Sequence, residues 1–179
     1  VLSVISRQKD RLISPEECAA QAKQQNDVRM TQIAKCYRRY QTQLQENNAL
    51  DFDDIIYLTV KLLRECDAGI KMGVASIDEV ENHVQDEAFR QNLVQCKREH
   101  DKLKREVQQE LDRFGDEGKN PNPIAKGMSW MKTNVMLGME DSDATIADLM
   151  TDGCNMGVKS LNRYLNQYKA ADERSKDIA

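Results

Sequence analysis

Apolar residues recur at intervals of three and four along most of the chain, which is the spacing of one face of an α-helix. Such runs occupy residues 55–77, 89–114 and 146–168, and a shorter one begins at Ile124. The clearest contains Phe89, Leu93, Cys96, His100, Leu103, Val107, Leu111 and Phe114. These four segments predict an antiparallel, up-down-up-down four-helix bundle over residues 51–179.

Two shorter helices are predicted before the bundle. Ser14 can cap the first amides of a helix that begins at Pro15, and Glu17 lies three residues after this cap. A second helix begins near Asp27 and ends around residues 47–48, with an apolar stripe of Met30, Ile33, Tyr37, Tyr40 and Leu44. We expect a helical hairpin over residues 1–50 that is too small to bury a core alone.

The composition supports an all-α fold. The 179 residues include 8 Gly and 3 Pro, which are too few turn formers for a many-stranded β fold. No stretch approaches the roughly 18 apolar residues of a membrane span, and the start lacks the pattern of a signal peptide. We therefore expect a cytoplasmic protein with no membrane partner. The five cysteines form no CxxC pair, so reduced thiols are expected.

Charge is distributed unevenly between the two predicted parts. The chain has 26 Lys and Arg against 30 Asp and Glu, a formal net charge of −4. Residues 1–50 carry a net charge of +3, which leaves −7 for residues 51–179. A mildly basic segment can contact phosphate, although solvated helix faces explain the same pattern. Only the N-terminal segment offers an argument for nucleic-acid binding.

Three blocks within residues 1–65 resemble UvrD/PcrA-type superfamily 1 DNA helicases: ISRQKDRLISPEE (5–17), YRRYQ (37–41) and NALDFDDII (48–56). In that family this stretch belongs to the helical accessory subdomain of the first motor domain, so the resemblance implies a role near the DNA duplex. It makes Arg7, Lys9, Arg38 and Arg39 the candidates for phosphate contact, with solvated surface as the alternative. We expect the resemblance to stop near residue 65.

The sequence lacks the residues that drive a helicase motor. ATP binding requires a GxxxxGK(S/T) loop for the phosphates and an acidic strand end for Mg²⁺, and neither occurs in this sequence. We therefore expect the chain not to be an enzyme driven by ATP.

Residues 60–179 resemble a group of bacterial ferritin-like four-helix-bundle proteins, on LLRECDAGIKMG (62–73), NPNP (120–123) and DLMTDGCNMG (148–157). The two resemblances meet near residues 59–65, which suggests a fusion of a helicase segment with a bundle protein. Ferritin-like di-iron sites need Glu-x-x-His pairs. Lys97 precedes His100 and Val80 precedes His83 at this spacing, so di-iron chemistry is not expected.

One set of possible metal ligands falls on the predicted core stripes: Cys66, Cys96, His100 and Cys154. Three thiolates and an imidazole suit tetrahedral zinc. The alternative is that these cysteines are buried as small hydrophobic residues and that His100 bonds to a neighbouring group. No cofactor is expected, and zinc is the alternative.

The sequence favours a non-catalytic protein of structural or protein-interaction type. A helicase segment separated from its motor would expose apolar residues such as Tyr37, Tyr40 and Leu44, and their cover would require a protein partner or self-association. The alternatives are DNA binding through residues 1–50 and a metal or redox role of the bundle.

Overall fold

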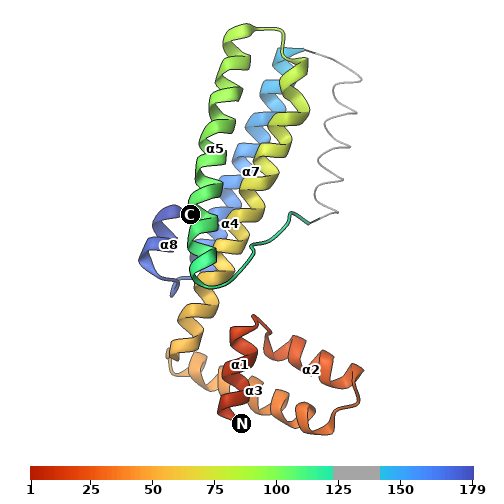
Figure 1. The fold of residues 1–179 in the computed structure, drawn as a ribbon, viewed down its shortest axis with the longest axis vertical. Helices are drawn as coiled ribbons and strands as arrows, with labels where there is room; N and C mark the ends of the chain where they lie inside the picture. The colour runs from red at the N-terminus through yellow and green to blue at the C-terminus, as the bar shows by residue number, and fades with distance from the viewer. Residues whose placement is uncertain (123–141) are drawn as a thin grey trace. The chain divides into compact units, whose positions relative to one another are not determined.

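The computed structural model describes residues 1–122 and 142–179 (Figure 1). Every regular element within these ranges is helical, which confirms the all-α prediction for the described residues. The predicted helix that begins at Ile124 lies outside them. The elements are α1 (Leu2–Asp10), α2 (Pro15–Gln24), α3 (Val28–Glu46), α4 (Phe52–Val80), the 3₁₀-helix η1 (Glu81–His83), α5 (Glu87–Arg113), α7 (Asp143–Gln167) and α8 (Glu173–Ile178).

The chain forms two compact units. The first unit contains residues 1–61 and 170–172, and the second unit contains residues 62–169 and 173–179. The division falls within α4, later in the chain than the boundary after residue 50 that the sequence suggested.

Local capping residues set the helix starts, as predicted. The Ser14 hydroxyl accepts a hydrogen bond from the Glu17 amide at 3.2 Å, and the Glu17 carboxylate accepts one from the Ser14 amide at 2.8 Å. The Asp27 carboxylate accepts a hydrogen bond from the Met30 amide at 2.9 Å. These bonds satisfy amides that lack partners within α2 and α3, so the predicted beginnings of both helices are confirmed.

The core of the first unit unites three helices rather than a hairpin. Ile5 of α1, Cys18 of α2, and Ala34 and Tyr37 of α3 form one buried cluster. Helix α1 was not predicted from the sequence, and it supplies the cover that the hairpin would have lacked. Tyr37 is 2% exposed and its hydroxyl donates a hydrogen bond to the Ile13 carbonyl, so the expected exposure of this residue is wrong.

The core of the second unit lies between α4, α5 and α7, which run side by side (Figure 1). One buried apolar cluster there contains Ile77 and Val80 of α4, Val84 before α5, Leu93 of α5 and Ile146 of α7. At one end of these helices, the Asp143 carboxylate accepts hydrogen bonds from the amides of Gln85 and Asp86 at 2.8 and 2.7 Å. The described part thus has three of the four predicted bundle helices, and a ferritin-like arrangement is not confirmed.

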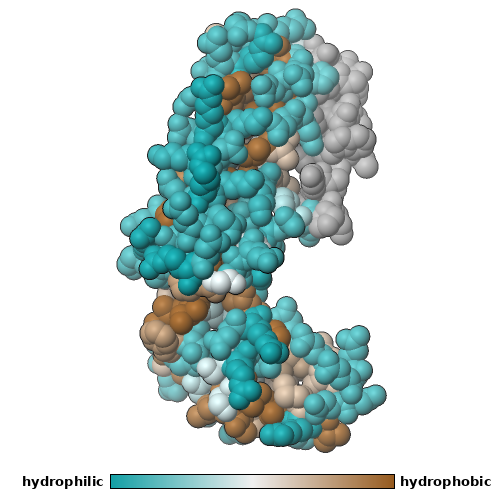
Figure 2. All heavy atoms as spheres, viewed as in Figure 1, coloured by the Kyte–Doolittle hydropathy of each residue, from teal (hydrophilic) through white to brown (hydrophobic). Residues whose placement is uncertain are grey.

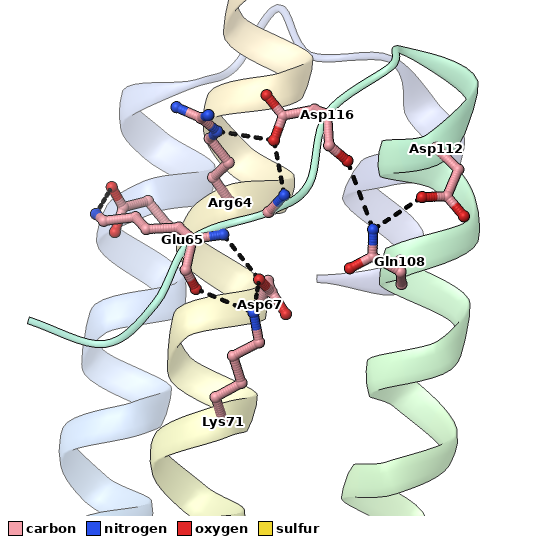
Figure 3. A network of polar contacts seen from close by, with 9 residues as sticks. Arg64, Glu65, Asp67, Lys71, Gln108, Asp112 and Asp116 are labelled. Atoms are coloured by element: carbon pink, nitrogen blue, oxygen red, sulfur yellow. Dashed lines mark hydrogen bonds and ion pairs between the residues drawn. The ribbon is translucent and has the colours of Figure 1, made fainter.

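A polar network holds the loop after α5 along α4 (Figure 3). Asp116 accepts hydrogen bonds from the Arg64 side chain and from the Gly118 amide, both at 2.9 Å. The buried carboxylate of Asp67 accepts one from the Lys119 amide at 2.8 Å. These bonds fix residues 116–119 to one face of α4.

A short helix, α8, follows the bundle helix α7. Arg174 of α8 lies 2.5 Å from the Glu110 carboxylate of α5. Because Glu110 is buried, this ion pair gives its carboxylate a partner and fixes α8 to α5. None of the helices described is both long and apolar enough to cross a membrane.

Candidate nucleic-acid interface

Helix α3 has a buried face and an exposed polar face. Ile33, Ala34 and Tyr37 point into the core of the first unit. At 3.6 residues per turn, residues at intervals of three, four and seven return to one side of a helix. The exposed side also contains Val28, Cys36, Gln45 and Glu46; what is called here the polar face of α3 consists of its other exposed side chains, Arg29, Gln32, Lys35, Arg38, Arg39, Thr42 and Gln43.

The polar face of α3 is positively charged. Lys35 and Arg39 lie one turn apart, and neither forms an ion pair with another residue in the described ranges. Arg38 lies 3.4 Å from the Glu16 carboxylate of α2, but both side chains are at least 60% exposed, so this pair contributes little. An anion that approaches this face therefore meets cations that no strong partner already neutralises.

Two of the predicted phosphate contacts, Arg38 and Arg39, lie on this face. A third, Arg7, is exposed on α1. Lys35 and Arg29 were not among the predicted contacts. Lys35 lies opposite the apolar stripe through Ile33 and Tyr37, and that stripe was the signal that could have identified it.

The fourth predicted contact, Lys9, is not on the surface. It is 2% exposed, and its ammonium lies 2.6 Å from Asp51 and 2.7 Å from Asp54 at the start of α4. A buried ammonium is stable only when it is paired, and these two carboxylates provide the pairing. Assigning Lys9 to DNA contact is therefore wrong.

The four predicted zinc ligands do not gather into a site. Within the described ranges, no group of three or more His, Cys, Asp or Glu side chains could hold a metal ion. Cys96 and His100 do lie together, with Sγ 3.6 Å from Nδ1. Cys66 is buried, whereas Cys154 is exposed.

The geometry of His100 explains why it is not a ligand here. Its Nδ1 donates a hydrogen bond to the Cys96 carbonyl at 2.8 Å. The other edge of the ring packs on α4, where an added Cβ at Gly73 would lie 3.0 Å from Nε2.

The Cys66 thiol is also unsuited to bind a metal ion. Burial is the largest influence on its pKa and raises it to about 12, so the thiol stays protonated at neutral pH. Helical spacing identified the core stripes, but it did not determine whether these side chains converge.

Residues 1–91, about half of the chain, match the family model of the UvrD/REP helicase N-terminal domain. The match extends beyond residue 65, where the sequence analysis expected the resemblance to end. The ATP-dependent DNA helicase PcrA of Staphylococcus epidermidis is 41% identical over 61 residues, which are 34% of this chain and 8% of the relative. The ATP-dependent DNA helicase UvrD1 of Mycobacterium tuberculosis is 39% identical over 62 residues, 35% of this chain and again 8% of the relative.

The chain thus spans about 8% of the length of these curated relatives. No solved structure matches it, and the comparisons do not support the ferritin-like resemblance of residues 60–179. The family match includes all of α1, α2, α3 and α4, and with them the polar face of α3. On this match, the chain belongs to the UvrD/REP helicase N-terminal domain family.

Proposed function

We propose that the first unit binds the phosphate backbone of DNA through the polar face of α3, as a helical accessory element of a UvrD/REP-type helicase. The observation that carries this proposal is the pair Lys35 and Arg39, exposed and without ion-pair partners among the described residues, in a segment of that family. The relatives that match this segment are named DNA helicases.

The chemistry of this face suits backbone contact rather than base recognition. Arg and Lys side chains neutralise phosphates and release counterions, while the Thr42 hydroxyl and the Gln43 amide can donate hydrogen bonds to phosphate oxygens. Contacts of this kind carry no sequence information and give dissociation constants of about 10⁻⁴ to 10⁻⁶ M at physiological salt. Because the sequence has no GxxxxGK(S/T) loop, the role proposed for this chain is DNA contact without ATP hydrolysis.

The test is a salt titration of binding to a fluorescein-labelled forked duplex, followed by fluorescence anisotropy. Each phosphate contact adds about −0.9 to the slope of log K against log salt. The double variant Lys35→Ala/Arg39→Ala should therefore bind more weakly and lose about two units of this slope. The control is Arg98→Ala/Arg105→Ala, which removes the same charge from exposed positions of α5.

The control separates a local interface from the effect of net charge. If both double variants lose the same affinity and slope, the polar face of α3 is not the binding site. If the unaltered chain does not bind the fork at low salt, DNA contact is excluded.

A second candidate function is protein binding, and a specific surface favours it. The first unit exposes five large apolar residues at its first helix and around the start of α4, between 39% and 75% exposed: Val1, Leu2, Leu50, Phe52 and Ile55. Figure 2 shows apolar patches on the visible face of the part that contains α1–α3. Exposed apolar clusters of this kind are typical of interaction sites.

Self-association would be the simplest form of this second function. Sedimentation velocity over a range of concentrations measures it directly. We expect Phe52→Ser to lower any association, while Val158→Ser, at an exposed apolar position of α7, should not. Equal effects of the two variants would contradict an interface on the first unit.

A further inference from the structure

A pocket of about 340 Å³ opens on the first unit between α1, α3 and the start of α4. Four of its residues come from α1, one from α3 and three from the residues that begin α4: Leu2, Ser3, Ile5, Ser6, Tyr40, Asp51, Phe52 and Asp53. We call it the acidic pocket. It combines carboxylates with hydroxyl groups and with two exposed apolar residues.

Negative charge exceeds positive charge around the acidic pocket. The buried ammonium of Lys9 is shared between Asp51, which lines the pocket, and Asp54. Asp53 forms no hydrogen bond or ion pair within the described ranges. Two carboxylates thus share one buried cation, and Asp53 is a third carboxylate that remains available to a ligand.

Tyr40 is bonded to one of the two carboxylates that line the acidic pocket. Its hydroxyl donates a hydrogen bond to Asp51 at 2.8 Å. This bond, followed by burial and by the charges of Asp51, Asp54 and Asp53, raises the pKa of Tyr40 to about 12. Tyr40 therefore stays protonated at neutral pH and keeps this hydrogen bond to Asp51.

The rim of the acidic pocket is apolar. Leu2 is 65% exposed and Phe52 is 75% exposed, and both line the opening. Ser3 and Ser6 lie one helical turn apart on α1 and present hydroxyl groups that can accept hydrogen bonds. A ligand that complements these groups has a cationic, hydrogen-bonding end and apolar surface beside it.

We propose that the acidic pocket binds an arginine side chain of a partner protein, presented in a segment with apolar residues on either side. The guanidinium ion can bond to Asp53 in a bidentate manner, donate to the serine hydroxyls and stack on the Phe52 ring. A metal ion is a poorer occupant, because no group of three or more metal-ligating side chains exists within the described ranges. DNA phosphates would be repelled by the carboxylates. This inference rests on the second candidate function and names the chemistry of its partner.

The test uses two tripeptides, acetyl-Leu-Arg-Leu-amide and its neutral counterpart acetyl-Leu-citrulline-Leu-amide, titrated into the full chain and followed by two-dimensional amide NMR. We expect the arginine peptide to give saturable shifts at Ser3, Ser6 and Phe52, and to bind at least about tenfold more tightly than the citrulline peptide. Asp53→Asn should remove most of this preference. Asp10→Asn, an equal charge change at an exposed residue of α1, should leave it unchanged.

Three results would overturn the proposal. The first is the absence of a saturable shift up to about 10 mM peptide, a range that covers millimolar affinities. The others are equal binding of the two peptides and equal effects of the two Asp variants. Any of these, found while Phe52→Ser still lowers self-association, would reject the arginine pocket and leave protein binding by the first unit intact. If Phe52→Ser also has no effect, the protein-binding function fails as well.

Discussion

The ammonium of Lys9, near the end of α1, lies 2.7 Å from the carboxylate of Asp54 in the first turn of α4, and both side chains are buried. Asp51 lies 2.6 Å from the same ammonium. This contact joins the first helix to a residue far away in the sequence. It also balances charges that would otherwise be buried alone.

Removal of the Lys9 charge should therefore destabilise the first unit strongly. We expect Lys9→Met to lower the free energy of unfolding by about 3–5 kcal/mol, because Asp51 and Asp54 would lose their shared cation. Chemical denaturation measures the change. Lys35→Met, at an exposed position of α3, should change stability by less than about 0.5 kcal/mol. Similar losses in both variants would contradict a structural role for the buried pair.

The same cluster should make stability depend on pH in the acid range. Burial is the largest influence on Asp51 and raises its pKa, but the hydrogen bonds from Lys9 and Tyr40, with that from the Asp54 amide, together outweigh it. The pKa of Asp51 in the folded chain is thus below its ordinary value of 3.8. A carboxyl of this kind stabilises the fold above its ordinary pKa, and this contribution is lost as the pH falls through the folded-state pKa.

The measurement compares unfolding free energies of the unaltered chain and of Asp51→Asn between neutral pH and about pH 3. The difference between the two should shrink as the pH falls below the ordinary value. A constant or growing difference would show that Asp51 does not contribute in its charged form.

The sequence could predict what local chemistry determines. Ser14 and Asp27 were expected to begin helices, and in the structure each accepts a hydrogen bond from the amide three residues later. Such caps involve residues that are neighbours in the chain, so no knowledge of the tertiary fold is needed. The periods of three and four in α5 and α7 are local in the same sense.

Sequence patterns were misleading where residues distant in the chain determine the structure. Helix α1 begins at Leu2, after Val1, which offers no capping side chain, and its inward positions are one apolar and one charged residue, Ile5 and Lys9. The carboxylates that allow Lys9 to be buried are 42 and 45 positions away in the sequence. Without α1, Tyr37 had no visible cover and Lys9 was interpreted as a surface cation. On the polar face of α3, Arg38 and Arg39 were predicted, but Lys35 was not. Lys35 lies outside the sequence blocks that carried the resemblance to helicases.

The cysteines should differ sharply in reactivity. Cys36 and Cys154 are exposed, whereas Cys18 and Cys66 are buried. Burial raises the pKa of the Cys18 thiol. It is also the largest influence on the Cys66 thiol, whose pKa is raised to about 12. Because the thiolate is the nucleophile, we expect a maleimide at neutral pH to label Cys36 and Cys154 in the folded chain and the buried pair only after unfolding. Peptide mapping by mass spectrometry identifies the labelled sites, and native labelling of Cys66 at the rate of Cys36 would contradict its burial.

Gly118 should not tolerate a side chain, because of its backbone conformation and because of Asp67 (Figure 3). Its φ angle is +82°, and an added Cβ would clash with the Asp67 carboxylate. That carboxylate cannot easily withdraw, since it is fully buried and bonded to the Lys119 amide and to Lys71. We expect Gly118→Ala to lower the free energy of unfolding by about 2–4 kcal/mol, from left-handed strain together with overpacking.

A second glycine provides the control for this prediction. Gly69 lies within α4, and an added Cβ there would have no atom within 4 Å. Because Ala favours a helix over Gly, Gly69→Ala should raise stability by up to about 1 kcal/mol. Urea unfolding of the two variants should therefore shift the midpoint in opposite directions. If Gly118→Ala unfolds at the same urea concentration as the unaltered chain, the contact between residues 116–119 and α4 does not contribute to the stability of the second unit.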